Sequence, residues 1–188
     1  MKIPSEAKLV FKGKIFDVYQ WEQKMFDGSF FTFEMLKRPN TVEIIATEKD
    51  KILLSHQSQP NKLDFYSLFG GRAEESEDPL STAKRELKEE AGLESKDWEL
   101  LRTYEPMHKI DWQIYMFVAR NCKKVDDPKL DAGEKIETVK CTFDRFMQII
   151  ESDKYWGNEL ALDILKMKQD KKKLQEFKEK IFPPYAKI

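Results

Sequence analysis

Three glutamates in one short segment are the residues of this chain whose types and spacing could do chemistry. Glu86, Glu89 and Glu90 stand at i, i+3 and i+4, so on a helix their carboxylates share one face. Arg85 is adjacent and can offset part of this charge through a bidentate contact, with Glu89 or Glu77 as its partner. Clustered carboxylates suit Mg²⁺ and Mn²⁺, which also bind water and phosphate oxygens. Two interpretations follow: a solvated acidic face, which is the commoner one, and a metal site that acts on phosphate.

The residues around the glutamates predict the helix that must position them. Asp78 followed by Pro79 is typical of a helix start, with an N-cap and a proline at the first position. Gly92 is typical of the left-handed residue that ends a helix. Four apolar residues between these ends fall on one arc and are expected to face the core. They are Leu80, Ala83, Leu87 and Ala91.

The segment 71–93 resembles the signature of the Nudix hydrolase family. That signature reads Gly, five residues, Glu, seven residues, then Arg-Glu-aliphatic-x-Glu-Glu-x-Gly-aliphatic. Its nine fixed positions are filled without a gap by Gly71, Glu77, Arg85, Glu86, Leu87, Glu89, Glu90, Gly92 and Leu93. A match at this spacing favours the metal site over the solvated face. The resemblance in strand order extends from about residue 9 to residue 168.

The resemblance implies a reaction, the hydrolysis of a nucleoside diphosphate linked to another moiety. Water attacks a phosphorus atom, and Mg²⁺ or Mn²⁺ neutralises the developing charge and lowers the pKa of bound water. Carried over by position, the implied metal ligands are Glu86, Glu89, Glu90 and the carbonyl of Gly70. Arg85 is placed in the catalytic site as an orienting partner, and Gly71 is a position beside the substrate. Glu77 is expected either in this machinery or as a cap of the loop.

Two segments outside the motif resemble ADP-ribose and nucleotide-sugar pyrophosphatases. Segment 14–36 looks like their N-terminal strand pair, with a hairpin turn at Asp27 and Gly28. In such enzymes these strands often help to form a dimer, so a homodimer is one hypothesis. Segment 130–137 looks like the acidic loop that supplies their general base, with Glu134 as the first candidate and Glu137 as the second. The alternative for this segment is an ordinary polar loop.

The residues just before the motif depart from the ADP-ribose pattern. The chain reads Ser-Leu-Phe-Gly-Gly at 67–71, without the glutamate and proline of that group, and the Gly-Gly ending resembles nucleoside-triphosphate members. Triphosphates, dinucleotides and capped RNA ends therefore remain alternative substrates, and a non-catalytic binding module is a third hypothesis that the complete set of carboxylates disfavours. Phe69 and Tyr104 are candidates to stack on a base, and Arg38 to bind phosphate or ribose. For the rings the alternative is a core position, and for Arg38 it is the solvated surface.

Composition narrows the partners and the location. Lysine plus arginine is 33 and aspartate plus glutamate is 34, so no basic surplus favours nucleic acid or an anionic membrane. A small-molecule substrate is therefore expected. Cys122 and Cys141 do not form a disulfide framework, which favours a reducing cytoplasm. No run approaches eighteen apolar residues, so no segment is expected to cross a membrane.

The pattern of apolar residues predicts an α+β fold, an α/β/α sandwich similar to the Nudix fold, with a mixed sheet and an N-terminal antiparallel strand pair. Strands are predicted at 9–21, 30–36, 41–47, 51–57, 98–104, 112–119 and 139–143. Helices are predicted at 144–152 and 159–168, and a solvated lysine-rich helix near 166–180. The predicted units are an N-terminal strand pair at 1–38, a hydrolase domain at 39–168 and a charged C-terminal helix or tail at 169–188.

Overall fold

The computed structural model describes residues 2–183. Its strands are β1 (Lys8–Lys12), β2 (Asp17–Lys24), β3 (Phe30–Lys37), β4 (Thr41–Glu48), β5 (Lys51–Gln59), β6 (Lys62–Ser67), β7 (Leu93–Glu94), β8 (Asp97–Tyr104), β9 (Ile110–Asp111), β10 (Ile114–Arg120), β11 (Lys123–Lys124) and β12 (Lys135–Cys141). Its helices are α1 (Pro79–Ala91), α2 (Phe143–Ile150), α3 (Asn158–Met167) and α4 (Lys171–Ile181). Within this part of the chain, no helix is long and apolar enough to cross a membrane.

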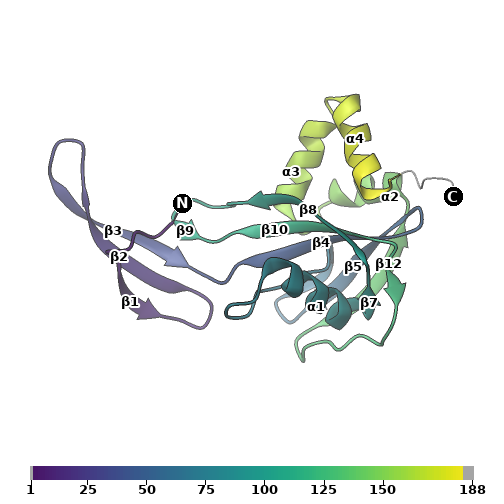
Figure 1. The fold of residues 1–188 in the computed structure, drawn as a ribbon, viewed down its shortest axis with the longest axis horizontal. Helices are drawn as coiled ribbons and strands as arrows, with labels where there is room; N and C mark the ends of the chain where they lie inside the picture. Colours follow the sequence, from purple (N-terminus) through teal and green to yellow (C-terminus); the bar gives the residue numbers. More distant parts are fainter. Residues whose placement is uncertain (1, 184–188) are drawn as a thin grey trace.

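A mixed sheet with helices on both faces forms the body of the molecule. Its strand order is β12-β5-β4-β10-β8, and β6 pairs with β5. Strands β4 and β10 are parallel, whereas β10 and β8 are antiparallel. Helix α1 lies on one face of this sheet, and α2, α3 and α4 lie on the other (Figure 1). The predicted α+β class and α/β/α layering are confirmed.

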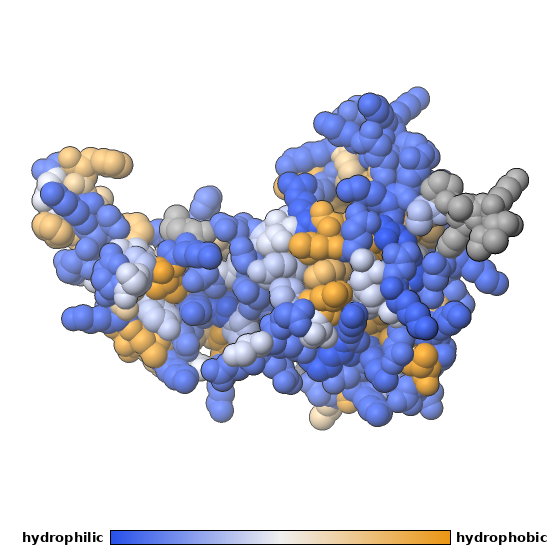
Figure 2. Space-filling model, viewed as in Figure 1, coloured by the Kyte–Doolittle hydropathy of each residue, from blue (hydrophilic) through white to orange (hydrophobic). Residues whose placement is uncertain are grey.

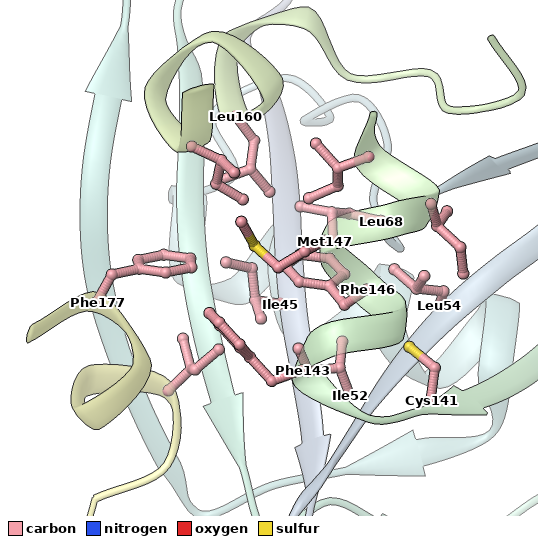
Figure 3. Packing of buried hydrophobic residues seen from close by; sticks show 14 of the residues in the cluster. Ile45, Ile52, Leu54, Leu68, Cys141, Phe143, Phe146, Met147, Leu160 and Phe177 are labelled. Atoms are coloured by element: carbon pink, nitrogen blue, oxygen red, sulfur yellow. The ribbon is translucent and has the colours of Figure 1, made fainter. Parts of the chain in front are cut away.

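Alternation along β4 explains the two layers. Val42, Ile44 and Ala46 belong to the buried cluster that packs under α1. Ile45 points to the opposite face and packs with Phe146 of α2 (Figure 3). Since side chains alternate along a strand, one sequence supplies both cores. The same alternation puts Glu43, which lies between two core residues, on the α2 and α3 side.

The lysine-rich helix predicted near 166–180 is present as α4, but it is partly buried and not fully solvated. Residues 184–188 of the predicted unit at 169–188 lie outside the described residues. On α4, Phe177 and Ile181 are buried in the same cluster as Phe146. The ring centroids of Phe177 and Phe143 lie 6.4 Å apart. Arg120 also binds this helix, because its Nε donates to the backbone carbonyl of Lys180 at 2.6 Å. Phe177 and Ile181 lie one turn apart among lysines, so the overall charge of the segment does not reveal its buried side.

The N-terminal segment forms a separate sheet of order β1-β2-β3-β9 that extends away from the body (Figure 1). The single strand predicted at 9–21 is two strands, because a turn closes at Gly13. The backbone N–H of Gly13 donates to the carbonyl of Phe16 at 3.1 Å and is 3.2 Å from Oδ1 of Asp17. The hairpin between β2 and β3 turns at Asp27 and Gly28, as predicted. Strand β6 was not predicted, since charged residues interrupt its apolar pattern.

The glycine-rich segment before α1 is held against β4. Strands β4 and β5 pair beside their connecting turn, at 46–48 with 51–53. Toward the start of β4, the segment 69–72 forms bridges to it instead. The N–H of Val42 donates to the carbonyl of Gly71, and the N–H of Ile44 to that of Phe69, both at 2.9 Å. These two hydrogen bonds hold the backbone of Gly70 and Gly71 against the start of β4.

Candidate active site

Helix α1 begins and ends where its sequence predicts. Oδ1 of Asp78 accepts from the N–H groups of Leu80 and Ser81 at 3.0 and 3.1 Å, which is an N-cap. Gly92 has φ 63°, the left-handed conformation that ends a helix. Its apolar arc is buried against the sheet, through residues that include Ala83 and Leu87. The glutamates lie on the side next to this arc, from the buried Glu90 to the half-buried Glu86 and Glu89.

Arg85 is the centre of the ion pairs on that side. Its guanidinium donates to both carboxylate oxygens of Glu77 at 3.0 and 3.1 Å. Its Nη1 donates to Glu86 and to Glu89, both at 2.9 Å. Hydrogen bonds from Arg85 hold the pKa of Glu77 down at about 2. Both partners predicted for Arg85 are thus engaged, and Glu77 also caps the loop by accepting from the N–H of Glu74 at 3.1 Å.

Glu90 joins the helix to the glycine pair. Its Oε2 accepts a hydrogen bond from the N–H of Gly70 at 2.8 Å, and only 7% of the residue is exposed. Burial raises the pKa of Glu90 to about 8, and the charges of Glu86, Glu134 and Glu89 add to this effect. Several carboxylates therefore lie close together in a place shielded from water. A bound cation would offset both their mutual repulsion and the cost of burying their charge.

These carboxylates line a cleft made of two hollows of about 730 and 770 Å³. The first holds Glu86 and Glu89 of the motif, and the second extends to the face of the sheet that carries α3. Both hollows are lined by Gly70, Glu90 and Glu134. The cleft thus connects the acidic face of α1 with a space large enough for a small organic ligand.

The chain matches the NUDIX domain family over residues 37–160. It belongs to the Nudix family. This Nudix chain is 27% identical over 159 residues to the "ADP-ribose pyrophosphatase" of Bacillus subtilis (strain 168), an alignment that covers 82% of this chain and 86% of that one. It is 26% identical over 163 residues to the "Methanol dehydrogenase activator" of Bacillus methanolicus, covering 85% and 88% of the two chains. The family assignment makes it a Nudix pyrophosphohydrolase.

A solved structure supports the fold independently of sequence. The "Crystal structure of ADP compounds hydrolase" superposes on this Nudix chain with a TM-score of 0.71. The match covers 89% of this chain and 94% of the other, at 18% identity. At this identity the likeness establishes the shared architecture, and the function has to be argued from the site.

The structure brings most of the predicted site residues together. Of these, the ones that line the first hollow are Arg38, Gly70, Gly71, Arg85, Glu86, Glu89, Glu90 and Glu134. Gly71 is placed where a side chain could not fit beside the motif, because a Cβ there would lie 2.4 Å from Oε1 of Glu86. Arg38 stacks on the ring of Trp112, with its Cζ 4.3 Å from the centroid.

Three predicted residues lie elsewhere or turn away. Glu137 is on β12 opposite His56, exposed, and lines neither hollow. Tyr104 faces α3, where its hydroxyl donates to Oδ2 of Asp163 at 2.7 Å. Phe69 is fully buried in the core cluster under α1, so its ring does not reach a base. Strand alternation decides the positions of Glu137 and Tyr104, and the bridge from Phe69 to Ile44 decides that of Phe69. The local sequence does not show which face of a strand is left open.

Two residues that line the cleft, Glu43 and Trp156, were not predicted from the sequence. Glu43 of β4 lines the second hollow, where burial and then the charge of Glu159 raise its pKa to about 7. Trp156 lines both hollows and carries Lys62 Nζ at 3.0 Å from its ring centroid. The signal for Glu43 was available, since a single acid interrupts the apolar run of β4.

The donor set suits a hard divalent cation, although the side chains are engaged with one another. Carboxylate oxygens and a carbonyl are the ligands that such cations take. Within residues 2–183, no group of three or more His, Cys, Asp or Glu side chains is arranged to hold a metal ion. Arg85 binds Glu86 and Glu89, and the Gly70 N–H binds Glu90. Each bond to Arg85 uses one carboxylate oxygen and leaves the other for a cation.

Proposed function

We propose that this Nudix enzyme hydrolyses the diphosphate bond of ADP-ribose or a related nucleoside diphosphate sugar, giving a nucleoside monophosphate and a sugar phosphate. The observation that carries this proposal is the cleft itself, in which the acidic motif opens directly into a second hollow of about 770 Å³. Such a hollow accommodates a nucleoside, with its phosphates at the motif. The relative named "ADP-ribose pyrophosphatase" supports the same substrate class.

The proposed cofactor is Mg²⁺ or Mn²⁺, held by Glu86, Glu89, Glu90 and the carbonyl of Gly70. When bound, the cation supplies charge neutralisation at the diphosphate and a more acidic water. Arg85 fixes the rotamers of Glu86 and Glu89 through its two hydrogen bonds. The N–H of Gly70 fixes Glu90 in the same way. These bonds restrict the three side chains, and the carboxylates have to turn toward one another to bind a cation, because no such group within residues 2–183 is arranged to hold one.

Glu134 is the proposed general base. It lines both hollows, follows a turn closed by its N–H to the carbonyl of Asp131 at 2.9 Å, and has a pKa raised by burial. A carboxylate with a raised pKa accepts a proton from water more readily near neutral pH.

Glu134→Gln is expected to lower kcat about a hundredfold or more, because general-base catalysis contributes roughly 10²–10⁴ in rate. Glu137→Gln, on the exposed face of β12, is expected to keep wild-type activity. Steady-state kinetics on the two purified variants makes the comparison. The reverse order of effects would transfer the role of base to Glu137.

The substrate is tested by a panel of diphosphates with Mg²⁺ or Mn²⁺, with products separated by chromatography. ADP-ribose should give AMP and ribose 5-phosphate. The second candidate class is nucleoside triphosphates, which the Gly-Gly sequence before the motif favours, and which would give a monophosphate and pyrophosphate. Dinucleotides and capped RNA complete the panel. Turnover of none of them with either metal would favour a non-catalytic binding module.

A homodimer through the N-terminal sheet belongs to the same proposal. Leu9, Phe11, Phe30 and Phe31 on strands β1 and β3 are 47–63% exposed. Figure 2 shows apolar residues at the end of the molecule that carries these strands. Exposed apolar patches on soluble proteins often mark interaction surfaces.

A cytoplasmic location is proposed from the two free cysteines, Cys122 and Cys141, which are both buried.

Replacing both Phe11 and Phe31 by serine is expected to shift the protein from dimer to monomer. The changes remove exposed apolar area without touching the buried clusters. Light scattering after size-exclusion chromatography measures the mass, and Phe26→Ser at the hairpin tip serves as a comparison. A wild-type mass of one chain across the micromolar range would contradict the dimer.

A further inference from the structure

Glu43 is a carboxylate in the cleft that the proposed reaction does not use. It lies near the start of β4, and its sequence neighbours Val42 and Ile44 are both core residues. Its Oε2 is fully buried and has no hydrogen-bond partner among residues 2–183. An unpaired buried carboxylate lowers the stability of a fold. A side chain that lowers stability inside a ligand cleft is a candidate for recognition of that ligand.

A second unpaired group lies near Glu43. The hydroxyl of Tyr155 is buried and also lacks a partner within the described chain. Burial and then the charge of Glu43 raise the pKa of this phenol, and no hydrogen bond joins the two groups. The hydroxyl packs tightly against the turn before α3, since a Cβ at Gly157 would lie 2.7 Å from it. Glu159 adds a further carboxylate to the same hollow.

The charge pattern along the cleft decides which part of a ligand reaches Glu43. Glu43 and Glu159 make this end acidic, and acidic walls repel phosphate. Arg38 stands at the junction of the two hollows, where an anion is attracted. Phe65 and Trp112 line the hollow that holds Glu43 and offer aromatic surface to a base. The end near Glu43 therefore suits an uncharged group that donates hydrogen bonds.

We propose that Glu43 is a specificity-determining residue that accepts a hydrogen bond from an amino or hydroxyl group of the nucleoside. The inference rests on the proposed function, since it assumes that the phosphates lie at the motif. A carboxylate can accept from either donor, whether the base amino group or the hydroxyls of the adenosine ribose.

The test is Glu43→Met, which keeps the length of the side chain and removes its acceptor. We expect kcat/KM for ADP-ribose to fall about 10- to 100-fold, mainly through KM, since hydrogen bonds to charged groups are among the stronger ones. We also expect the melting temperature to rise, because an unpaired buried carboxylate is lost. The matched control is Glu48→Met at the other end of the same strand, a half-buried glutamate that pairs with Lys140 and lines neither hollow, which should leave kcat/KM unchanged. An unchanged kcat/KM in Glu43→Met, or a lower melting temperature, would overturn the inference.

Two analogues identify the donor. One carries hypoxanthine in place of adenine and lacks the amino group, and the other lacks both hydroxyls of the adenosine ribose. On the analogue that lacks the recognised donor, Glu43→Met should lose little further activity. An equal loss on ADP-ribose and on both analogues would show that Glu43 contacts neither group, and would overturn the inference.

Binding of AMP, measured by calorimetry in the absence of metal, separates this inference from the proposed function. If the wild type hydrolyses no diphosphate but its affinity for AMP falls 10- to 100-fold in Glu43→Met, the hydrolase proposal fails and the inference stands. If hydrolysis is found and the variant binds AMP as the wild type does, the inference fails alone. If the wild type neither hydrolyses nor binds AMP, both fail.

Discussion

Glu90→Gln is expected to lower kcat about a hundredfold or more with Mg²⁺ or Mn²⁺ present. The proposed cation is worth several kcal/mol in the transition state, and a hundredfold corresponds to about 2.7 kcal/mol. The substitution removes one negative charge and leaves the shape of the side chain unchanged. An amide carbonyl can still accept from the N–H of Gly70, so the loop should keep its position.

Stability distinguishes a lost ligand from a damaged fold. The pKa of Glu90 is raised to about 8, so its charged form is disfavoured in the metal-free protein, and the melting temperature of the variant should equal or exceed that of the wild type. Glu94→Gln, on an exposed residue of β7 that pairs with Lys88, is the matched control and should leave kcat unchanged. Wild-type kcat in Glu90→Gln would remove Glu90 from the metal site.

The motif helix was predictable because its signals are local. The Asp78 cap, the proline after it and the Gly92 stop act within one or two turns, and the apolar arc of α1 needs only the helical period. The partner Glu89 was assigned to Arg85 for the same reason, since it lies one turn away on the same helix. Local signals therefore fixed the part of the site that lies on one element.

Residues on strands were harder to place, because the open face of a strand is decided by what packs on it. Tyr104 and Glu137 both lie on strands of the central sheet. The side chain of Tyr104 faces α3, and that of Glu137 faces solvent. Phe69 is core because its segment bridges to β4 at Ile44, a long-range pairing that no local pattern signals. Glu43 lines the cleft because it alternates with Val42 and Ile44, whose side chains face α1.

The average character of a segment concealed two further features. The lysine-rich sequence of α4 suggests a solvated helix, yet Phe177 and Ile181 dock it on the body. At the other end of the chain, the partial alternation at 9–21 continues through a turn at Gly13 that separates β1 from β2. In both places a few residues with tertiary partners outweigh the average character of the segment.

Gly70→Ala is expected to be the most destabilising single methyl addition at a glycine of the cleft. Gly70 has φ 149°, a backbone conformation that favours glycine, and a Cβ there would lie 2.1 Å from the carbonyl oxygen of Val42. The obstacle is backbone, so it cannot rotate away. Relief requires the loop to move from β4, which breaks the 2.9 Å hydrogen bonds to Val42 and Ile44.

The expected loss is roughly 3 kcal/mol or more, as for other overpacked or strained positions, and corresponds to a fall in melting temperature of about 6–12 °C. Activity should fall with it, because the displaced N–H no longer holds Glu90.

Two control variants separate the effect of backbone strain from that of the close contact with β4. Gly28→Ala, at φ 87° with nothing within 4 Å of its Cβ, should show the strain alone, and Gly133→Ala, whose nearest neighbour is 4.0 Å away, should show neither. Thermal unfolding and kinetics of the three variants make the comparison. If Gly70→Ala were no less stable than Gly28→Ala, the close approach of the loop to β4 would not be what fixes the glycine pair beside Glu90.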